Sequence, residues 1–399
     1  MRQKTRARKR LVAFIATAAL AAGYAAAQAQ DPKILGFKKR FVVEITNPSP
    51  LTLENHAIIL NVTRLRSSIA EDFNTYNYAI FEEAGGNYTL VVTQADDLDK
   101  DRYHDEIVLV RTLPPSSTTR LICYYSPNRS FQLMPAQKAF ARAAWEIGGA
   151  EAGWESNLVA FKFVDGRIEF YGKLAAGLIL KKFPTPENRP QDWGMDVVDT
   201  GESAGLGGLS LWDGDVRVPL FGAWARQAKM TVISPGPVRA MVKAEFSGLS
   251  TPLDGVGLTA FFSAFADNVA SRQDIVITSK ASGPIVYGPG IQKLAGETFT
   301  LDKDKGFLAA WGKGAKNAGE IGLAAIFRPA DFAGMEETAL DRSVKLKGPA
   351  GAKLTHWVVC AWEYGITSPG VPAAKNWLRK VEGLAQSLLV PVKVEFKAK

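Results

Sequence analysis

The chain has 399 residues, with 48 Lys and Arg against 40 Asp and Glu. This length is too great for one ordinary domain and fits two. Only three histidines occur, His56, His104 and His356, which excludes a multi-histidine zinc site of the usual kinds. The chain has two cysteines, Cys123 and Cys360. Because both cysteines lie in apolar, strand-like runs, LICYY and WVVCAW, we expect buried free thiols, with a disulfide as the alternative.

Residues 1–29 have the pattern of a secretory signal. A basic head precedes an apolar run from Leu11 to Ala22, and Ala27-Gln28-Ala29 matches a cleavage site. We expect removal after Ala29, and therefore an exported protein, periplasmic or extracellular. A retained membrane anchor is the alternative, although the run is short for a membrane span and no later segment resembles one.

Removal of the signal changes the charge balance. The signal contains six basic and no acidic residues, which leaves 42 basic against 40 acidic residues in the mature chain. No Lys and Arg run of the kind that follows a phosphate backbone occurs after Arg40. A nucleic-acid partner therefore loses its main support, and we expect none.

The first block, residues 32–128, reads as a small antiparallel β-sandwich. Its segments are β-branched or aromatic, several alternate, and turn residues separate them. The expected strands are 40–47, 57–65, 88–94, 106–113 and 118–125.

The second block, residues 136–399, also reads mostly as strands. Only Pro372–Leu389 has apolar residues at helical spacing, so we expect one C-terminal helix. So much strand pattern with so little helix predicts an all-β protein whose second block is a large β-sandwich. The expected strands are 158–163, 167–172, 208–212, 228–234, 238–248, 258–266, 271–281, 306–312, 321–327 and 354–365.

The segment from Trp193 to Asp215 is rich in glycine, carboxylates and tryptophan. Glycine weakens both helices and core strands, so this composition favours a loop. Its aromatic and acidic side chains are of the types that line a sugar-binding cleft. A plain surface connection is the alternative.

An acidic loop offers a calcium site. Asp97, Asp99, Asp101 and Asp105 stand at positions 1, 3, 5 and 9 of a possible oxygen-ligand loop. The loop departs from the usual pattern at Arg102, where glycine is expected, and at Val108, where an acid is expected. The alternative is a solvated hairpin loop.

His356 is the best single candidate for a general base, because only histidine titrates near neutral pH without help. Strand alternation places it on one face with Val358, Cys360 and Trp362. A core or rim histidine is the alternative. Neither a nucleophile elbow nor a phosphate loop is present, and we expect no organic cofactor.

Several motifs occur in the order seen in domain-of-unknown-function family 4861, which this chain resembles. They are the acidic element at Asp97–Glu106, WESNLVAF at Trp154–Phe161, GMD at Gly194–Asp196, the glycine element at Gly201–Gly208, LWDG at Leu211–Gly214, PGPVR at Pro235–Arg239 and the late strand HWVVCAWEYG. The chain departs from the family pattern at Ser156 and Arg102. It also lacks the histidine expected before GMD, which puts in doubt any scheme relying on that histidine.

The resemblance implies an exported protein of polysaccharide breakdown. It further implies a large domain similar to the β-supersandwich of mutarotases and several polysaccharide lyases, and elimination on uronic-acid-containing oligosaccharides. In that scheme His356 serves as base or acid, and Lys162 or Arg239 faces the uronate. Asp196, Glu155 and Glu202 hold hydroxyls or act as an acid, and the stacking surfaces are Trp154, Trp193, Trp212 and Trp362.

Two other functions stay open at this point. A glycoside hydrolase would use two carboxylates, for which Glu155, Asp196, Glu202 and Asp213 are candidates. A non-catalytic glycan-binding protein would need only an aromatic platform. All three readings share an oligosaccharide or polysaccharide partner.

Overall fold

A computed structural model describes residues 36–128, 135–144, 151–182, 189–222, 228–247, 249, 255–279, 284–315 and 317–398. The signal segment, residues 1–29, lies outside the described residues. The described part is mostly strand, in five antiparallel sheets with two α-helices, one of them near the C-terminus. The predicted all-β class is therefore confirmed.

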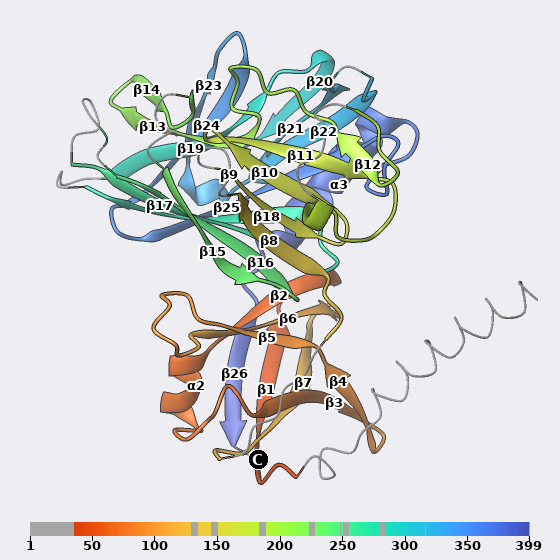
Figure 1. Cartoon of the computed structure of the whole chain (residues 1–399), viewed down its shortest axis with the longest axis vertical. Helices are drawn as coiled ribbons and strands as arrows, with labels where there is room; N and C mark the ends of the chain where they lie inside the picture. Colours follow the sequence, from red (N-terminus) through yellow and green to blue (C-terminus); the bar gives the residue numbers. More distant parts are fainter. Residues whose placement is uncertain are drawn as a thin grey trace, which may run out of the picture.

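The first unit is a sandwich of two sheets, with strand orders β26-β1-β7-β3-β4 and β2-β6-β5. Figure 1 shows it as the lower body. Alternate residues of β1, Phe41, Val43 and Ile45, point into its core, as their period-two burial requires. The strands are β1 (Lys39–Asn47), β2 (Leu53–Asn61), β3 (Tyr78–Ala84), β4 (Asn87–Val91), β5 (Thr93–Asp96), β6 (Glu106–Leu113), β7 (Ser117–Tyr125) and β26 (Lys393–Ala398).

The expected strand 57–65 is wrong in its second half. The chain turns into helix α2 (Val62–Ser68) directly after β2, and the side chain of Asn61 caps it by accepting a hydrogen bond from Arg64 N at 2.7 Å. Val62 and Leu65 face the core. Two apolar residues at helical spacing are too few for periodicity to distinguish a helix from a strand.

The last strand, β26, belongs to the first unit although the sequence pattern placed residues 136–399 together. It pairs antiparallel with β1, from Phe41 opposite Ala398 to Thr46 opposite Lys393. In Figure 1 it runs down beside β1. Both ends of the described chain thus lie in one sheet.

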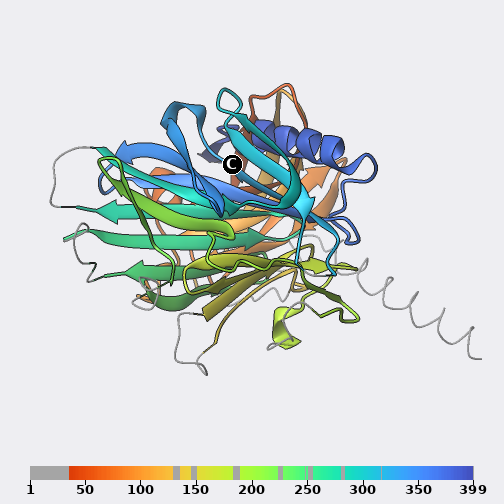
Figure 2. The ribbon, with the colours of Figure 1, turned by 90° about the horizontal axis from the view of Figure 1, so that it is seen from above.

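The large unit packs an eight-stranded sheet against two five-stranded sheets. Its main core, which includes Phe161, Tyr287 and Val358, draws on all three. Figure 2 shows the sheets as layers seen from above. The eight-stranded sheet is formed by β15 (Ala228–Pro235), β16 (Arg239–Phe246), β17 (Gly257–Phe265), β18 (Ala270–Thr278), β25 (Lys353–Trp362), β22 (Glu320–Ile326), β21 (Phe307–Lys313) and β20 (Ala295–Asp302).

The five-stranded sheets cover one face of this large sheet. One is formed by β12 (Gly194–Asp196), β11 (Arg167–Lys173), β10 (Ala160–Val164), β9 (Glu151–Ser156) and β8 (Ala139–Ala144). The other is formed by β14 (Val216–Pro219), β13 (Leu206–Asp213), β19 (Pro284–Gln292), β24 (Asp341–Pro349) and β23 (Phe332–Glu337).

The opposite face of the eight-stranded sheet carries helix α3 (Ala373–Leu388), which matches the predicted helix. Trp377, Val381 and Ala385 are its buried residues, four apart, and they pack on β21, β22 and β25. The large sheet is thus covered by apolar side chains on both faces.

The glycine-rich segment is only partly a loop. Strand β13 is buried over most of its length, against the expectation from its glycines. A Cβ on Gly207 would lie 2.7 Å from side-chain atoms of Gln273 and Val358, and one on Gly208 would lie 2.5 Å from Ala204 O. The glycines permit close packing here, rather than a flexible turn.

The two units meet through the outer face of β2 and β6. Val108 packs against Val238 and Phe265 of the large unit, with Ala57 and Ile59 beside it. The two cysteines are buried and unpaired, Cys123 in the first unit and Cys360 in the large core.

Candidate functional site

His356 lies in the main core, which does not fit a catalytic role. Its side chain is fully buried on β25, and its Nε2 is 2.8 Å from the side-chain oxygen of Gln273. Burial lowers the pKa of His356 to about 3, against a smaller raising effect of Asp274. Alternation placed it correctly with Val358, Cys360 and Trp362, but that face is the core face.

Three of the tryptophans expected to stack on sugars are structural. Trp154 is fully buried between Phe161 and Phe262, with ring centroids at 5.8 and 5.0 Å. The indole of Trp362 donates to Ala318 O at 2.6 Å, and the indole of Trp212 donates to Glu336 at 2.7 Å. These three rings are packed inside the protein, with exposed fractions of 0, 4 and 7%, and the indole N–H groups of Trp362 and Trp212 are used by partners within the chain.

Arg239 is also structural, and it joins the two units. Its guanidinium donates to Asp96 through Nε at 2.8 Å and to Glu106 through Nη1 at 2.7 Å. Its backbone N donates to the side-chain oxygen of Gln94 at 2.9 Å. Because all these partners come from the first unit and Arg239 is 2% exposed, it cannot face a uronate.

Glu155 is locked in an internal ion pair. Its carboxylate accepts hydrogen bonds from Lys173 Nζ at 2.6 Å and from the backbone N of Ile179 and Leu180. Burial raises the pKa of Glu155, although Lys173 and the backbone donors oppose this. The pair fixes the 3-10 turn η1 (Leu180–Lys182) on the sheet, which is a structural role.

Lys162, Asp196 and Trp193, however, do come together. They lie on the face of the β8–β12 sheet that points away from the main core, with Glu169 and Tyr171 between them. Lys162 is opposite Glu169 in the register, and Tyr171 is opposite Asp196. We call these five residues the polar face.

The polar face combines charges with an aromatic edge. Lys162 Nζ lies 4.0 Å from Glu169 Oε2, and their side chains are 8% and 14% exposed. Asp196 and Tyr171 are buried, with exposed fractions of 2% and 3%. Asp196 accepts a hydrogen bond from Val198 N at 3.3 Å. The half-buried Trp193 meets Tyr171 edge to face, with ring centroids 5.8 Å apart.

Glu169 and Asp196 form a diagonal carboxylate pair on this face. Since Asp196 stands opposite Tyr171, Glu169 is its diagonal neighbour across β11 and β12. Such neighbours have their Cβ atoms about 7–8 Å apart. Thr200 Oγ1 donates to Glu169 Oε1 at 3.3 Å.

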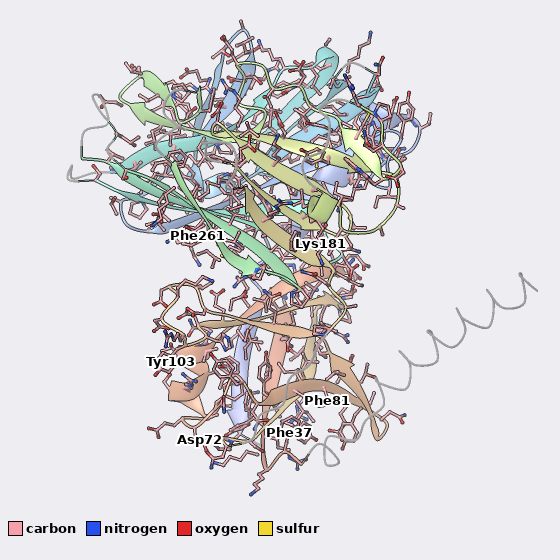
Figure 3. All side chains as sticks on the ribbon, in the orientation of Figure 1. Phe37, Asp72, Phe81, Tyr103, Lys181 and Phe261 are labelled. Atoms are coloured by element: carbon pink, nitrogen blue, oxygen red, sulfur yellow. The ribbon has the colours of Figure 1, made fainter. Side chains whose placement is uncertain are left out.

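The sequence pattern missed Glu169 and Tyr171, although a signal was present. Residues 167–172 were predicted as a strand, in which Ile168 and Phe170 alternate with Glu169 and Tyr171. The apolar pair enters the main core, so the polar pair must face the other way. An apolar cluster of Ala160, Ile179 and Leu180 borders the polar face, and Lys181, labelled in Figure 3, lies 5.2 Å from the ring of Phe140 beside it.

Glu202 and Asp213 lie apart from this group. Both are exposed, Glu202 in a turn before β13 and Asp213 at the end of that strand. Neither pairs with Glu155 or Asp196 in the register of the sheets.

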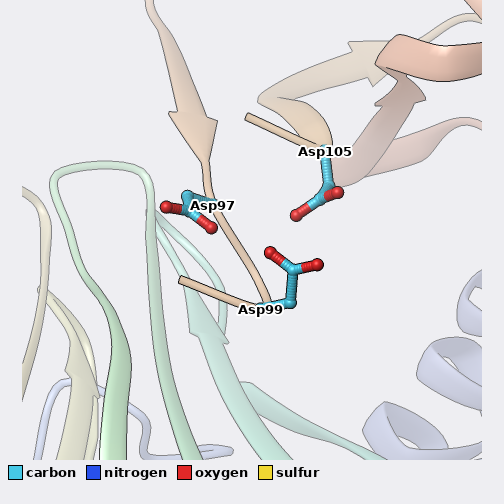
Figure 4. A group of neighbouring side chains, drawn as sticks. All are labelled: Asp97, Asp99 and Asp105. Atoms are coloured by element: carbon cyan, nitrogen blue, oxygen red, sulfur yellow. The ribbon is translucent and has the colours of Figure 1, made fainter. Parts of the chain in front are cut away.

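In the acidic loop, three of the four predicted ligands converge. One carboxylate oxygen from each of Asp97, Asp99 and Asp105 lies within 4.8 Å of the others, as Figure 4 shows. Asp101 is outside this group; its carboxylate accepts a hydrogen bond from Tyr103 N at 2.8 Å. The oxygen ligands suit Ca²⁺, and calcium binding here stays a prediction.

The protein is thus a small β-sandwich joined to a large multi-sheet β-sandwich, and one outer sheet of the large unit carries the polar face. The chain belongs to the family described as a domain of unknown function, DUF4861, whose model matches residues 45–394. No curated protein matches the sequence. In addition, neither described helix has the length and apolarity to span a bilayer.

Among solved structures, a protein in the glycosyl hydrolase family 38 from Enterococcus faecalis is similar, with 10% identity and a TM-score of 0.52 over 93% of this chain. This chain spans about half of that protein, 49% of its length. An alpha-mannosidase from Enterococcus faecalis V583 has 9% identity and a TM-score of 0.49, covering 90% of this chain and 46% of its own. At these identities the likeness concerns the fold alone.

Proposed function

We propose that this protein is an exported carbohydrate-active enzyme that acts on uronic-acid-containing oligosaccharides by elimination. The observation that carries the proposal is the polar face, where a lysine, two carboxylates, a tyrosine and a tryptophan gather on one sheet. The fold likeness to a protein in the glycosyl hydrolase family 38 supports a carbohydrate partner. The proposed calcium ion has a separate, structural place in the acidic loop of the first unit.

Elimination requires a cation that neutralises the uronate carboxylate, a base and a proton donor. The polar face offers a candidate for each. A proton leaves the carbon beside the uronate carboxylate, a double bond forms to the next carbon, and the bond to the leaving oxygen breaks. The ammonium of Lys162 neutralises the carboxylate while charge develops on it. Asp196 accepts the proton, the phenol of Tyr171 protonates the leaving oxygen, and Trp193 offers a stacking surface.

The proposal is tested by ultraviolet absorbance of the unsaturated product. The purified protein is incubated with oligosaccharides of galacturonate, glucuronate and alginate, with and without calcium. We expect the absorbance to rise with native protein. The rate of this rise should be at least about 100-fold lower in Lys162→Met and in Asp196→Asn, since positioned acid–base groups contribute that much to the rate. Glu202→Gln, an exposed carboxylate outside the polar face, is the matched control and keeps the native rate.

A second candidate is hydrolysis, favoured by the diagonal pair of Glu169 and Asp196. Hydrolases place two carboxylates about 5–10 Å apart across the scissile bond. Hydrolysis produces new reducing ends without ultraviolet absorbance, and both Glu169→Gln and Asp196→Asn would abolish them. Neither product from any substrate would reject both reactions and leave a glycan-binding role.

A further inference from the structure

A cleft of about 620 Å³ lies where the first unit meets the outer face of the eight-stranded sheet. Strand β2 supplies one wall, through His56, and strands β18 and β25 supply the floor. The segment between α3 and β26 closes a further side. Ligand pockets commonly lie at such junctions and have volumes of about 300–1,000 Å³.

The floor places an arginine beside an aromatic ring. Arg272 on β18 is directly opposite Trp357 on β25, so the two side chains are neighbours on the face away from the main core. Trp357 is half-buried, which leaves part of its indole at the cleft. A sugar ring stacks on such a partly exposed aromatic surface while polar groups around it fix its orientation.

Arg272 is held in place through one nitrogen only. Its Nε donates to Asp274 Oδ1 at 3.0 Å, and Thr355 Oγ1 donates to the same oxygen at 2.6 Å. No hydrogen bond joins its two terminal nitrogens to the described residues, and its side chain is 23% exposed. The guanidinium is therefore pre-oriented with two donors available, the geometry that binds a carboxylate in a bidentate manner.

Arg328 adds a second positive charge. It is exposed just beyond the end of β22, and within the described part of the chain its side chain has no ion-pair partner. Neither Asp nor Glu is among the residues that line the cleft. Asp274 offsets only Arg272, so Arg328 leaves the cleft with a net positive charge.

The remaining polar groups suit hydroxyls. Asn268 and Thr355 border the floor, and His56 faces it from the first unit. Burial, and then the charge of Arg272, lowers the pKa of His56 to about 4, so His56 is neutral at pH 7 and adds hydrogen-bonding capacity without charge.

From these contacts we infer that the cleft between the two units is a second saccharide site, which binds a carboxylate-bearing sugar through Arg272 and Arg328 with its ring on Trp357. This site is distinct from the polar face, which lies on another sheet. The choice of a saccharide and of a carboxylate rests on the proposed function, whereas the requirement for an anionic group comes from the two arginines of the cleft.

Calorimetric titration with matched ligands tests the inference. The probes are short oligosaccharides of galacturonate, glucuronate and alginate, each beside its carboxyl-reduced, uncharged counterpart. We expect native protein to bind at least one acidic probe about tenfold or more tightly than its reduced form, since a charged hydrogen bond is typically worth that factor. We expect Arg328→Ala to weaken that binding about 10–100-fold.

Two controls separate this effect from misfolding. Arg40 is an exposed arginine of β1 outside the cleft, so Arg40→Ala removes the same charge and keeps native affinity. Trp357→Leu keeps an apolar side chain but removes the ring, and we expect it to weaken the acidic and reduced probes alike. Arg328→Ala, by contrast, weakens only the acidic one.

The inference is overturned if native protein binds no acidic probe, if it does not distinguish acidic from reduced probes, or if Arg328→Ala binds them as native protein does. The proposed elimination fails separately, when cleft binding is seen but no probe yields ultraviolet absorbance. Conversely, absorbance that rises with unchanged affinity in Arg328→Ala would keep the elimination and reject the cleft.

Discussion

Two arginines lie along the contact between the units, and their surroundings differ. Arg239 is surrounded by Asp96, Glu106 and Gln94 of the first unit and is almost fully buried. Arg328 is exposed beside the cleft and has no carboxylate partner among the described residues. The same residue type thus serves as a fixed connection at one end of the interface and as an available charge at the other.

The presence of an arginine in a motif does not by itself identify a binding residue. Arg239 stands in the PGPVR element, which made it a candidate for uronate binding, yet its donors are used by the protein itself. Arg328 stands in no motif. A buried charge must be paired within the protein to be tolerated, whereas an exposed charge stays in contact with solvent and is available to a ligand.

Among substitutions of the two arginines, Arg239→Met is expected to have the largest effect on stability. The substitution leaves Asp96 and Glu106 without their cation inside the interface, and we expect the free energy of unfolding to fall by about 3–5 kcal/mol. Urea denaturation measures it, with Arg328→Met as the control. A loss below about 1 kcal/mol would mean that the interface does not depend on this ion-pair network.

His356 of the large sheet and His56 of the cleft make the stability of the protein depend on pH. His356, with a pKa lowered to about 3, and His56, with a pKa lowered to about 4, stay neutral in the folded protein. The unfolded chain takes up these protons below about pH 6.5, so acid favours unfolding. Their contribution to stability is complete above pH 6.5 and declines below it.

We expect each histidine to cost about 1.4 kcal/mol of unfolding free energy per pH unit between pH 6 and 4.5. Urea denaturation at several pH values measures the slope. His356→Gln keeps a polar partner for Gln273 and removes one titrating group, so its slope is shallower. An equal slope in native protein and variant would show that His356 does not carry this dependence.

Calcium in the acidic loop is expected to stabilise the first unit. It should also stabilise the contact between the units, because Lys100 of this loop donates to Ile233 O of the large unit at 2.6 Å. At a calcium concentration 100-fold above Kd the gain is about 2.7 kcal/mol. Thermal unfolding with calcium and with chelator measures it. Asp99→Asn removes one converging ligand, and Asp101→Asn is the matched control outside the group. A melting temperature indifferent to calcium would reject the site.

The smallest expected effect is that of Arg328→Ala on stability. Since this side chain is exposed and has no ion-pair partner within the described residues, we expect the free energy of unfolding to change by less than about 0.5 kcal/mol. Urea denaturation measures it beside Arg239→Met. A larger loss would assign Arg328 a structural role and remove the contrast between the two arginines.

Local pattern determined much of the fold from the sequence alone. Residues 106–113 were predicted as a strand and form β6, and Pro372–Leu389 was predicted as a helix and contains α3. Period-two and period-3.6 spacing are properties of neighbouring residues, so they can be read without knowing the tertiary structure. The buried glycines of β13 were misjudged, because their close approach to Gln273 and Val358 is not a local property.

The site was decided by the tertiary structure. His356 and Trp357 are consecutive, and alternation shows only that they face opposite ways. Both faces of the eight-stranded sheet are covered, one by the main core and the other by α3 and the first unit. Which of the two residues borders a cleft therefore depends on what packs against each face.

The sequence by itself determined that this is an all-β protein with a C-terminal helix, since these features follow from short-range periodicity. Only the tertiary structure brought His56, Arg272, Arg328 and Trp357 to one cleft, from four separate segments in both units. The tertiary structure also pairs the donors of Arg239 and the indole N–H groups of Trp154 and Trp362 with partners inside the protein. Burial and pairing are long-range properties, and they decide which polar side chains remain available for a ligand.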